Sequence, residues 1–273
     1  MGIITISREL AALGDETARE VARVSGFRLV DKKVLEKRMC ACGGESEVFR
    51  LYDERKPPFF SNMSGARDMY LHYLKTAILE EAAAGSCVFI GRGAAAVLKG
   101  LAGVLPVFLL SPRAVRVERV RGYFQCDEKK ACAIICHSDS ERAGFHRYFF
   151  DVEWRDTANY RLALNTAAVS PALAARLIDG ARALLFDELS EAACADGLRD
   201  LALAQRVIHH IVYERALPVQ FLDVVVKDGA ACLYGAAQAV TVTAAAEQAA
   251  GEVPGVVSAS SEIQVVQDFS VFH

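Results

Sequence analysis

The feature that most constrains this fold is a repeated order of short apolar runs, each followed by a polar turn and a helical pattern. Residues 3–7 (IITIS) form a β-branched run, and after Gly14 the apolar side chains fall on one helix face. Similar runs recur at residues 27–30, 87–90 and 104–110. Strands that are apolar throughout are typical of parallel sheets covered by helices on both faces. The sequence therefore predicts an α/β fold with a parallel sheet.

The polar residues that follow these runs are candidates for a functional site. Residues 162–164 predict a fifth strand, and residues 69–84 predict an amphipathic helix that ends at Gly85. Ligands of parallel sheets bind just beyond the carboxyl ends of the strands, so side chains there should converge on one cleft. They are Ser7, Arg8, Asp31, Gly91, Arg92 and Ser111. For Asp31 and Ser111, ordinary turn chemistry is an equal alternative.

From about Arg199 the pattern changes to that of a small α+β module, which we assign to residues 199–267. Its expected helices and strands are residues 201–212, 222–227, 231–234, 242–251 and 263–266, with a hairpin turn at Asp228-Gly229. Residues 180–196, rich in alanine and acidic side chains, are expected to connect it to the first domain, residues 1–185.

Composition excludes several classes of protein. With 53% hydrophobic residues the 273-residue chain can bury a core, and a net charge of −3 supplies no field for nucleic acid or an anionic membrane. The start, MGIITISREL, has no basic leader, which predicts a cytoplasmic protein. The uncharged residues 229–246 contain few large apolar side chains and predict strands and a helix start instead of a membrane span.

The eight cysteines follow no disulfide framework and are expected to be free thiols. Cys126, Cys132, Cys136 and His137 are an alternative zinc site, but their spacing matches no paired C-x-x-C pattern. We therefore predict no resident metal site made by side chains alone.

The first strand, loop and helix have the geometry of a phosphate-binding loop, because loop amides and a helix N-terminus present unpaired N–H donors. The usual G-x-x-x-x-G-K-[ST] spacing, however, places Asp15 at the lysine and Glu16 at the hydroxyl residue when Gly14 is the second glycine. On spacing alone the motif fails.

Arginines are dense between residues 113 and 147, after the fourth predicted strand. Arg113, Arg116 and Arg119 lie three apart and can share one helix face, and guanidinium groups suit two-point contact with phosphate. A solvated helix surface is the plainer explanation. The position after a strand, where a lid over the cleft belongs, favours a functional role.

Four stretches in order along the chain carry a specific resemblance. They are ITISRELAALGDETAREVARVSGFRLVDKKVLEKR, CVFIGRGAAAVLKG, VFLLSPRAVRVERV and SDSERAGFHRYFFDVEWRDTANYRLALNTAAVSPALAARLI. Together they resemble the cytidylate kinase-like family, which opens with a strand, an SRE turn, a glycine-rich loop, a helix and a strand ending in aspartate.

The resemblance implies a P-loop nucleoside monophosphate kinase fold over residues 1–185, and transfer of the ATP γ-phosphoryl group, with Mg²⁺, to CMP or a similar nucleotide. It implies contacts to the donor phosphates from Ser7, Arg8, Gly14 and Thr17. It implies contacts to the acceptor from Asp31, Gly91 and Arg92. The candidates to neutralise the transferring charge are Arg116, Arg119, Arg142 and Arg147.

The chain departs from the family pattern in two places. Where members commonly show FGSGGRE, this chain has LAALGDE at residues 10–16, so glycines are lost and Asp15 replaces a basic residue. A carboxylate repels a triphosphate. After Gly91-Arg92, members often carry an acidic residue, and this chain has Gly93 and three alanines. A catalytically weak or inactive nucleotide-binding sensor is therefore the alternative function.

Residues 199–267 resemble a BON domain, through a strand, a DG turn, a strand ending in glycine, a helix, PGV and a final strand. Such domains are associated with phospholipids or other ligands. Because this module carries about −3 charge, we expect it to contact a small ligand or a protein instead of a membrane. A purely structural packing role is an equal alternative.

A further alternative is a dinucleotide site at Gly91-x-Gly93-x-x-Ala96, which fits G-x-G-x-x-G/A. It follows the third strand instead of the first, and the next strand ends without the acidic residue that binds a ribose hydroxyl.

Overall fold

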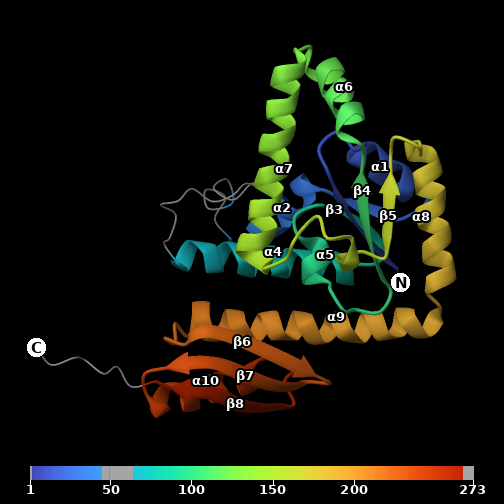
Figure 1. Ribbon diagram of the computed structural model, residues 1–273. Helices are drawn as coiled ribbons and strands as arrows, with labels where there is room; N and C mark the ends of the chain where they lie inside the picture. The colour runs from blue at the N-terminus through green and yellow to red at the C-terminus, as the bar shows by residue number, and fades with distance from the viewer. Residues whose placement is uncertain (1, 45–48, 50–63, 267–273) are drawn as a thin grey trace, which may run out of the picture. The chain divides into compact units, whose positions relative to one another are not determined.

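The computed structural model describes residues 2–44, 49 and 64–266. The chain divides into two compact units, Met1–Cys194 and Ala195–His273, each with its own sheet (Figure 1). Two consecutive prolines, Pro57 and Pro58, predict a loop, and they lie outside the described residues.

The first unit contains a five-stranded sheet in which every neighbouring pair is parallel. Its strands are β1 (Ile3–Arg8), β2 (Arg28–Val30), β3 (Cys87–Ile90), β4 (Val104–Leu110) and β5 (Leu162–Asn165). The order across the sheet is β2-β3-β1-β4-β5. This confirms the predicted α/β class, and two of the strand ranges expected from the apolar runs, 87–90 and 104–110, agree with the observed bounds.

The helices of this unit follow the strands in alternation. They are α1 (Gly14–Ser25), α2 (Lys32–Ala41), α4 (Ser64–Ala83), α5 (Ala94–Val97), α6 (Arg113–Phe124), α7 (Glu128–Phe150), the short η1 (Thr157–Asn159) and α8 (Pro171–Leu185). Helices α1 and α8 pack together over one face, where Ala18 and Ile178 join a core with Ile4 and Ile6. Alternate strand residues point to the second face.

The second face is aromatic. Phe108 of β4 lies edge-on to Trp154, with ring centroids 5.6 Å apart, and stacks on Tyr160 at 4.9 Å. Trp154, Tyr70 and Phe89 are among the largest fully buried side chains of the described residues. These large rings cover the second face of the sheet. Both faces are therefore buried, as the apolar strand runs predict.

The topology places the loop after β1 at a distinctive point. From the central β1 the chain builds β2 and β3 on one side and then crosses to β4 and β5 on the other. Ligands of open parallel sheets bind at such a reversal, beyond the carboxyl ends of the strands. Residues 9–13, which join β1 to α1, therefore lie where a ligand is expected.

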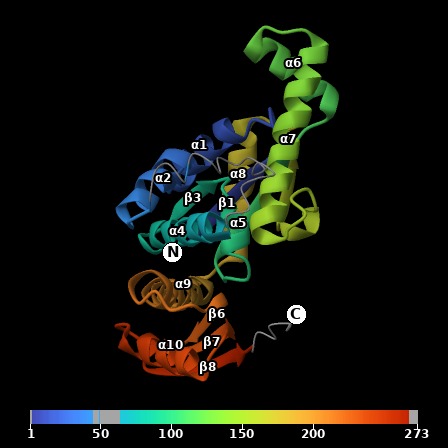
Figure 2. The same ribbon diagram turned by 90° about the vertical axis from the view of Figure 1, so that its left-hand side faces the viewer.

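Helices α6 and α7 form an antiparallel hairpin that projects beyond the carboxyl ends of the strands in both views (Figures 1 and 2). Val117 and Val120 of α6 pack against Ala131 and Ile135 of α7, and Leu10 and Ala11 of the β1–α1 loop pack against the same cluster. The hairpin and the loop therefore share a small apolar core of their own.

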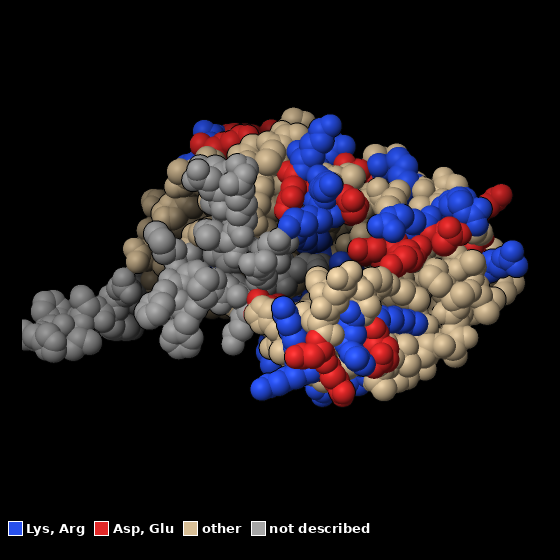
Figure 3. Space-filling view, turned by 90° about the horizontal axis from the view of Figure 1, so that it is seen from above, with Lys and Arg blue, Asp and Glu red and all other residues tan. Residues whose placement is uncertain are grey.

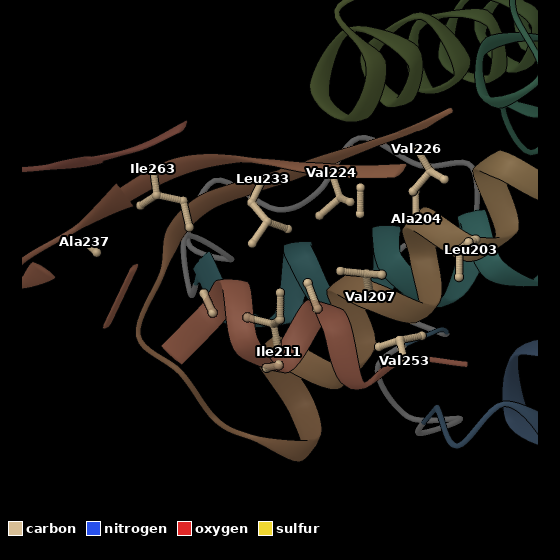
Figure 4. Packing of buried hydrophobic residues seen from close by; sticks show 14 residues of the cluster. Leu203, Ala204, Val207, Ile211, Val224, Val226, Leu233, Ala237, Val253 and Ile263 are labelled. Carbon is tan, nitrogen blue, oxygen red and sulfur yellow. The ribbon is translucent and has the colours of Figure 1, made fainter. Parts of the chain in front are cut away.

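The second unit is a three-stranded sheet in the order β6-β7-β8, with β6 antiparallel and β8 parallel to β7. Its elements are the end of α9 (Glu188–His209), a π-helical turn (His210–Glu214), β6 (Gln220–Lys227), β7 (Ala230–Ala237), α10 (Val240–Glu252) and β8 (Ser258–Val265). Leu203, Val207 and Ile211 pack with Val224 and Leu233 of the sheet (Figure 4). The α+β pattern expected after Arg199 is thus present.

Residues 180–196, expected to connect the two domains, contain the boundary between the compact units at Cys194 and Ala195, and they are mostly helical. Helix α8 continues to Leu185 and α9 begins at Glu188, where the carboxylate of Asp187 accepts hydrogen bonds from the N–H and hydroxyl of Ser190. Alanine is the strongest helix former, so an alanine-rich stretch with a capping aspartate continues as helix.

Among the described residues, none of the helices combines the length and the apolar composition that a membrane span requires. Residues 229–246 lie mainly in β7 and the start of α10.

Candidate functional site

The loop between β1 and α1 has a conformation that its residues do not favour. Ala11 and Leu13 adopt left-handed backbone angles, with φ of 59° and 54°. A side chain in this region costs about 1–2 kcal/mol relative to the usual helical region, which is why glycine is common there. These are the two positions at which the family pattern FGSGGRE has glycines that this chain lacks. The loop therefore keeps the glycine-type path although alanine and leucine occupy it.

The α6–α7 hairpin holds the loop in this shape. Arg119 donates to the carbonyl of Ala11 at 2.9 Å, and Arg116 donates to the carbonyl of Leu10 at 3.3 Å. The carboxylate of Asp139, on α7, accepts from the N–H of Leu10 at 3.1 Å. Three side chains from the hairpin thus bind two consecutive residues of the loop, which offsets the cost of the left-handed angles.

Arg8 lies across the start of α1 because residue 14 has no side chain. A Cβ added to Gly14 would lie 2.4 Å from Cγ of Arg8, far inside van der Waals contact. The Nε of Arg8 is 4.0 Å from a carboxylate oxygen of Asp15. The sequence raises the question of what compensates the acidic residue at the lysine position, and in the structure Asp15 has a guanidinium beside it.

Two cavities adjoin at Arg8 and Asp15, which border both. We call the first the loop pocket; it measures about 220 Å³. It is lined by Arg8, Glu9, Leu10, Ala11, Leu13, Gly14, Asp15, Glu16, Val120, Tyr123, Phe124 and Arg142. The first-turn N–H groups of an α-helix have no partner within the helix, so the start of α1 adds donors to this lining.

We call the second cavity the strand-edge pocket; it measures about 290 Å³. It is lined by Arg8, Asp15, Ala18, Arg19, Leu29, Asp31, Lys32, Lys33, Ile90 and Arg92. Five of these side chains are cationic and two are carboxylates, so the pocket attracts a small anion. Arg92 is only 4% exposed and contacts Tyr70 and Glu36 at 3.4 and 3.5 Å, which holds its guanidinium in place.

Asp31 and Gly91 also have backbone roles at this edge. Asp31 caps α2, its carboxylate accepting from the N–H of Val34 at 3.0 Å, which is the turn chemistry that the sequence left open. Gly91, with φ of 69°, donates its N–H to the carbonyl of Ile6. Asp31 borders the strand-edge pocket, whereas Gly91 does not.

Ser7 and Thr17, expected at the donor phosphates, border neither cavity. Both are buried, and Ser7 contacts Tyr160, whose hydroxyl donates to the carbonyl of Trp154. Burial raises the pKa of Tyr160, so this phenol stays protonated near neutral pH. Ser7 and Thr17 therefore do not reach the cavities.

The four candidate arginines separate into different roles. Arg142 borders the loop pocket, as expected for a residue that faces a transferring group. Arg116 and Arg119 hold the loop, and the second nitrogen of Arg119 donates to the carbonyl of Thr166 at 2.7 Å. Arg147 is exposed near the end of α7 and pairs with Glu153 at 2.7 Å. The structure does not bring Arg147 to either cavity.

A buried network of ion pairs, which the sequence does not predict, lies next to the loop. Arg116 contacts Asp139 at 2.7 Å and Glu9 at 3.5 Å, and Arg155 contacts the same carboxylates at 2.7 and 3.0 Å. Glu9 also accepts from the N–H of Ser111 at 3.2 Å. Ion pairs between distant segments leave no local sequence pattern, so the sequence does not predict this network.

We expect Asp139→Ala to lower the free energy of unfolding by about 3–5 kcal/mol, because it leaves the guanidinium of Arg116 buried with a weakened partner set. Urea unfolding of the full chain, followed by circular dichroism, measures the change. Glu118→Ala is the matched control, since Glu118 pairs with Arg121 on the surface and should cost no more than about 1 kcal/mol. Equal losses in the two variants would contradict a structural role for the network.

The remaining alternatives find no support in the described residues. No group of three or more side chains there could hold a metal ion, which leaves the zinc alternative at Cys126, Cys132, Cys136 and His137 without a site. Gly93 adopts φ of 72°, and an added Cβ would lie 2.2 Å from the ring of Phe150. Close packing against this ring therefore accounts for the second glycine of the dinucleotide-like pattern.

Charge on the surface is mixed in sign. On the face shown in Figure 3, Lys and Arg side chains drawn in blue lie next to Asp and Glu side chains drawn in red. The described residues on that face thus alternate in sign instead of forming the broad basic patch of a nucleic-acid-binding surface.

Comparison with known proteins gives one match at the level of family. The model of the cytidylate kinase-like family matches residues 3–168. No curated protein matches the chain.

Solved structures with similar chains include an uncharacterized protein from Eubacterium ventriosum ATCC 27560, with 19% identity, a TM-score of 0.48 and coverage of 66% of this chain and 99% of that one. Shikimate kinase from Bacteroides thetaiotaomicron has 15% identity and a TM-score of 0.40, over 67% of this chain and 98% of its own. A gluconokinase from Sinorhizobium meliloti 1021 has 17% identity and a TM-score of 0.38, over 68% and 98%.

Proposed function

Because the chain belongs to the cytidylate kinase-like family, we propose that it transfers the γ-phosphoryl group of ATP to a nucleoside monophosphate, with CMP as the first candidate. The observation that carries this proposal is that the loop pocket and the strand-edge pocket share Arg8 and Asp15. Two adjoining cavities with one guanidinium between them suit a reaction in which two phosphorylated molecules meet.

The loop pocket fits the donor. Its lining combines the start of α1 with Arg8 and Arg142, which are donors suited to phosphate oxygens. The left-handed residues Ala11 and Leu13 preserve a loop path that a phosphate-binding sequence would build from glycine. The phosphates of ATP would be held by Gly14, Arg8 and Arg142.

Mg²⁺ would neutralise phosphate charge in this pocket. Asp15 and Glu16 border it and provide the carboxylate oxygens that Mg²⁺ prefers. Since the described residues form no cluster of three or more ligating side chains, Mg²⁺ would be bound mainly by phosphate oxygens and water.

The strand-edge pocket fits the acceptor. Arg92 and Arg8 contribute guanidinium groups to its lining, and Arg19, Lys32 and Lys33 add further positive charge. Leu29, Ile90 and Ala18 provide an apolar wall. A phosphate group bound to Arg92 and a sugar or base against this wall would match that lining, which supports a nucleoside monophosphate as acceptor.

Transfer joins an oxygen of the acceptor phosphate to the γ-phosphorus of ATP and breaks the bond from that phosphorus to the β,γ-bridging oxygen, which leaves on ADP. Such transfer depends on positioning and on stabilising negative charge. Arg8 and Arg142 are the side chains that would neutralise this charge. Arg116 and Arg119 are positioning residues, because they act through the loop.

The direct test is incubation of the full chain with Mg-ATP and each common nucleoside monophosphate, with products separated by ion-exchange chromatography. We expect CDP from CMP in excess of a protein-free control. Absence of any nucleoside diphosphate product from any acceptor, at high protein concentration, would reject the catalytic proposal.

The sensor alternative has its own supporting observation, since Asp15 and Glu16 place two carboxylates at the mouth of the loop pocket. These carboxylates would repel the triphosphate. If Arg8 pairs with Asp15 instead of with the phosphates, the chain would lose more in catalysis than in nucleotide binding. Calorimetry with ATP and CMP distinguishes the two functions. Binding without turnover favours a sensor, and absence of binding by any nucleotide rejects both.

For the second unit, a BON-like module that contacts a small ligand or a protein stays a prediction, as does a cytoplasmic location. Exposed apolar residues on its sheet, Val225 at 53% and Tyr234 at 43%, support a contact surface there. Asp223 and Glu262 flank Tyr234 in the strand register, which argues against an anionic membrane as the partner.

A further inference from the structure

We propose that Tyr123 and Phe124, at the end of α6, form a stacking platform for the nucleobase of the nucleotide whose phosphates occupy the loop pocket. This inference rests on the proposed function, which supplies the nucleotide. It adds a binding site for the base and assigns it to residues that the motif comparison left without a role.

The lining of the loop pocket contains two chemically different groups of residues. Arg8, Arg142 and the first N–H groups of α1 suit phosphate. The apolar and aromatic members are Leu10, Ala11, Leu13, Val120, Tyr123 and Phe124. A nucleotide has the same two components, an anionic phosphate chain and a flat, weakly polar ring.

The exposure of the two aromatic side chains is unusual for their position. Tyr123 is 59% exposed and Phe124 is 58% exposed, whereas Val117 and Val120 on the same helix are buried against α7. Val120, Tyr123 and Phe124 are three and four residues apart, so they lie on one side of the helix at its last turns. The two rings thus extend the apolar side of α6 beyond its packed part, along the wall of a cavity.

Stacking is the interaction that two exposed rings offer to such a ligand. Bases stack on aromatic side chains through their π faces, and this contact tolerates different bases. Leaving two large rings exposed costs solvation free energy that a bound base would recover. The replacement of family glycines by Ala11 and Leu13 adds apolar surface to the lining that these rings share, which favours a base in this pocket.

The test compares ATP with inorganic tripolyphosphate, which has the phosphate chain without the base. We would measure both dissociation constants by calorimetry, in the presence of Mg²⁺, for the full chain and for the double variant Tyr123→Leu/Phe124→Leu. Leucine keeps apolar bulk at both positions and removes the π faces, so the packing of α6 against α7 is retained. Leu184→Ala is the control, since Leu184 is 89% exposed and borders neither cavity.

We expect the double variant to bind ATP about 10- to 100-fold more weakly, because base stacking on aromatic side chains is worth a factor of this order. Its affinity for tripolyphosphate should stay within twofold of the unmodified chain, and Leu184→Ala should bind both ligands normally. The reciprocal variant Tyr123→Phe/Phe124→Tyr, which keeps both rings, should retain ATP affinity.

Unchanged ATP affinity in the leucine variant would overturn the platform, and so would an equal loss of ATP and tripolyphosphate binding. Ligand binding by the unmodified chain distinguishes failure of this inference from failure of the proposed function. If that chain binds both ligands and the variant behaves like it, only the platform is rejected. If that chain binds neither ligand, the proposed function is rejected and the platform with it.

Discussion

Replacing Arg8 with methionine is expected to lower kcat for phosphoryl transfer by about 10³-fold or more, the range that one well-placed arginine contributes to such reactions. Arg8 borders both cavities, and its guanidinium lies beside Asp15, where the usual loop motif has a lysine. Methionine keeps the unbranched stem that crosses Gly14 and removes only the charge. A coupled assay for ADP, at saturating ATP and CMP, measures the effect.

Two further variants test whether the loss comes from the position of the Arg8 guanidinium. Gly14→Ala should reproduce most of the loss without touching the arginine, because the added Cβ would lie 2.4 Å from Cγ of Arg8 and displace it. Arg19→Met is the control, since Arg19 borders only the strand-edge pocket and should alter the KM for the acceptor with little change in kcat. A kcat for Arg8→Met within tenfold of the unmodified chain would remove Arg8 from the reaction.

Arg92→Ala is expected to lower kcat/KM for CMP by about 10²- to 10⁴-fold while leaving the dissociation constant of ATP unchanged. Arg92 borders the acceptor cavity alone and is 4% exposed, so its contact with a phosphate would be largely desolvated. Breaking a buried charge pair typically costs about 3–5 kcal/mol, which corresponds to that range. Steady-state kinetics with varied CMP, together with calorimetry for ATP, gives both quantities.

Loss of folding would also abolish activity, and retained ATP binding guards against that explanation. Arg92→Lys should restore part of the activity, because lysine keeps the charge but not the two-point geometry of a guanidinium. Arg121→Ala is the surface control, since Arg121 is exposed and pairs with Glu118 on the surface. If ATP binding and CMP turnover fell by the same factor, Arg92 would be a structural residue and not an acceptor contact.

Strands β3 and β4 were predictable because each is a continuous apolar run. Residues 87–90 and 104–110 are buried on both faces of the sheet, so their sequence carries no alternation and stands out from the helices around it. Residues 180–196 were expected to connect the two units, and the boundary at Cys194 and Ala195 falls within them. Their helical structure follows from local preference, because alanine favours helix and Asp187 caps the helix that follows.

The residues that line the two cavities were predictable where they directly follow strands. Arg8, Asp31 and Arg92 follow strands and do border the cavities. Ser7 and Thr17 share the same stretch, but a side chain's direction depends on the pleat and on the helix turn, and both face inward. Arg116 looked like a phosphate ligand, and its guanidinium instead joins Asp139 and Glu9 in a buried network.

By itself, the sequence determined a parallel α/β unit followed by a smaller α+β unit, because burial on two faces and the change of pattern near Arg199 are properties of local residue order. The tertiary structure alone decided which charges meet. Asp15 lies beside Arg8, and Arg119 holds the carbonyl of Ala11, across separations in the chain of 7 and 108 residues. Electrostatic pairing depends on distance in space, and for segments far apart in the chain only the folded backbone sets that distance.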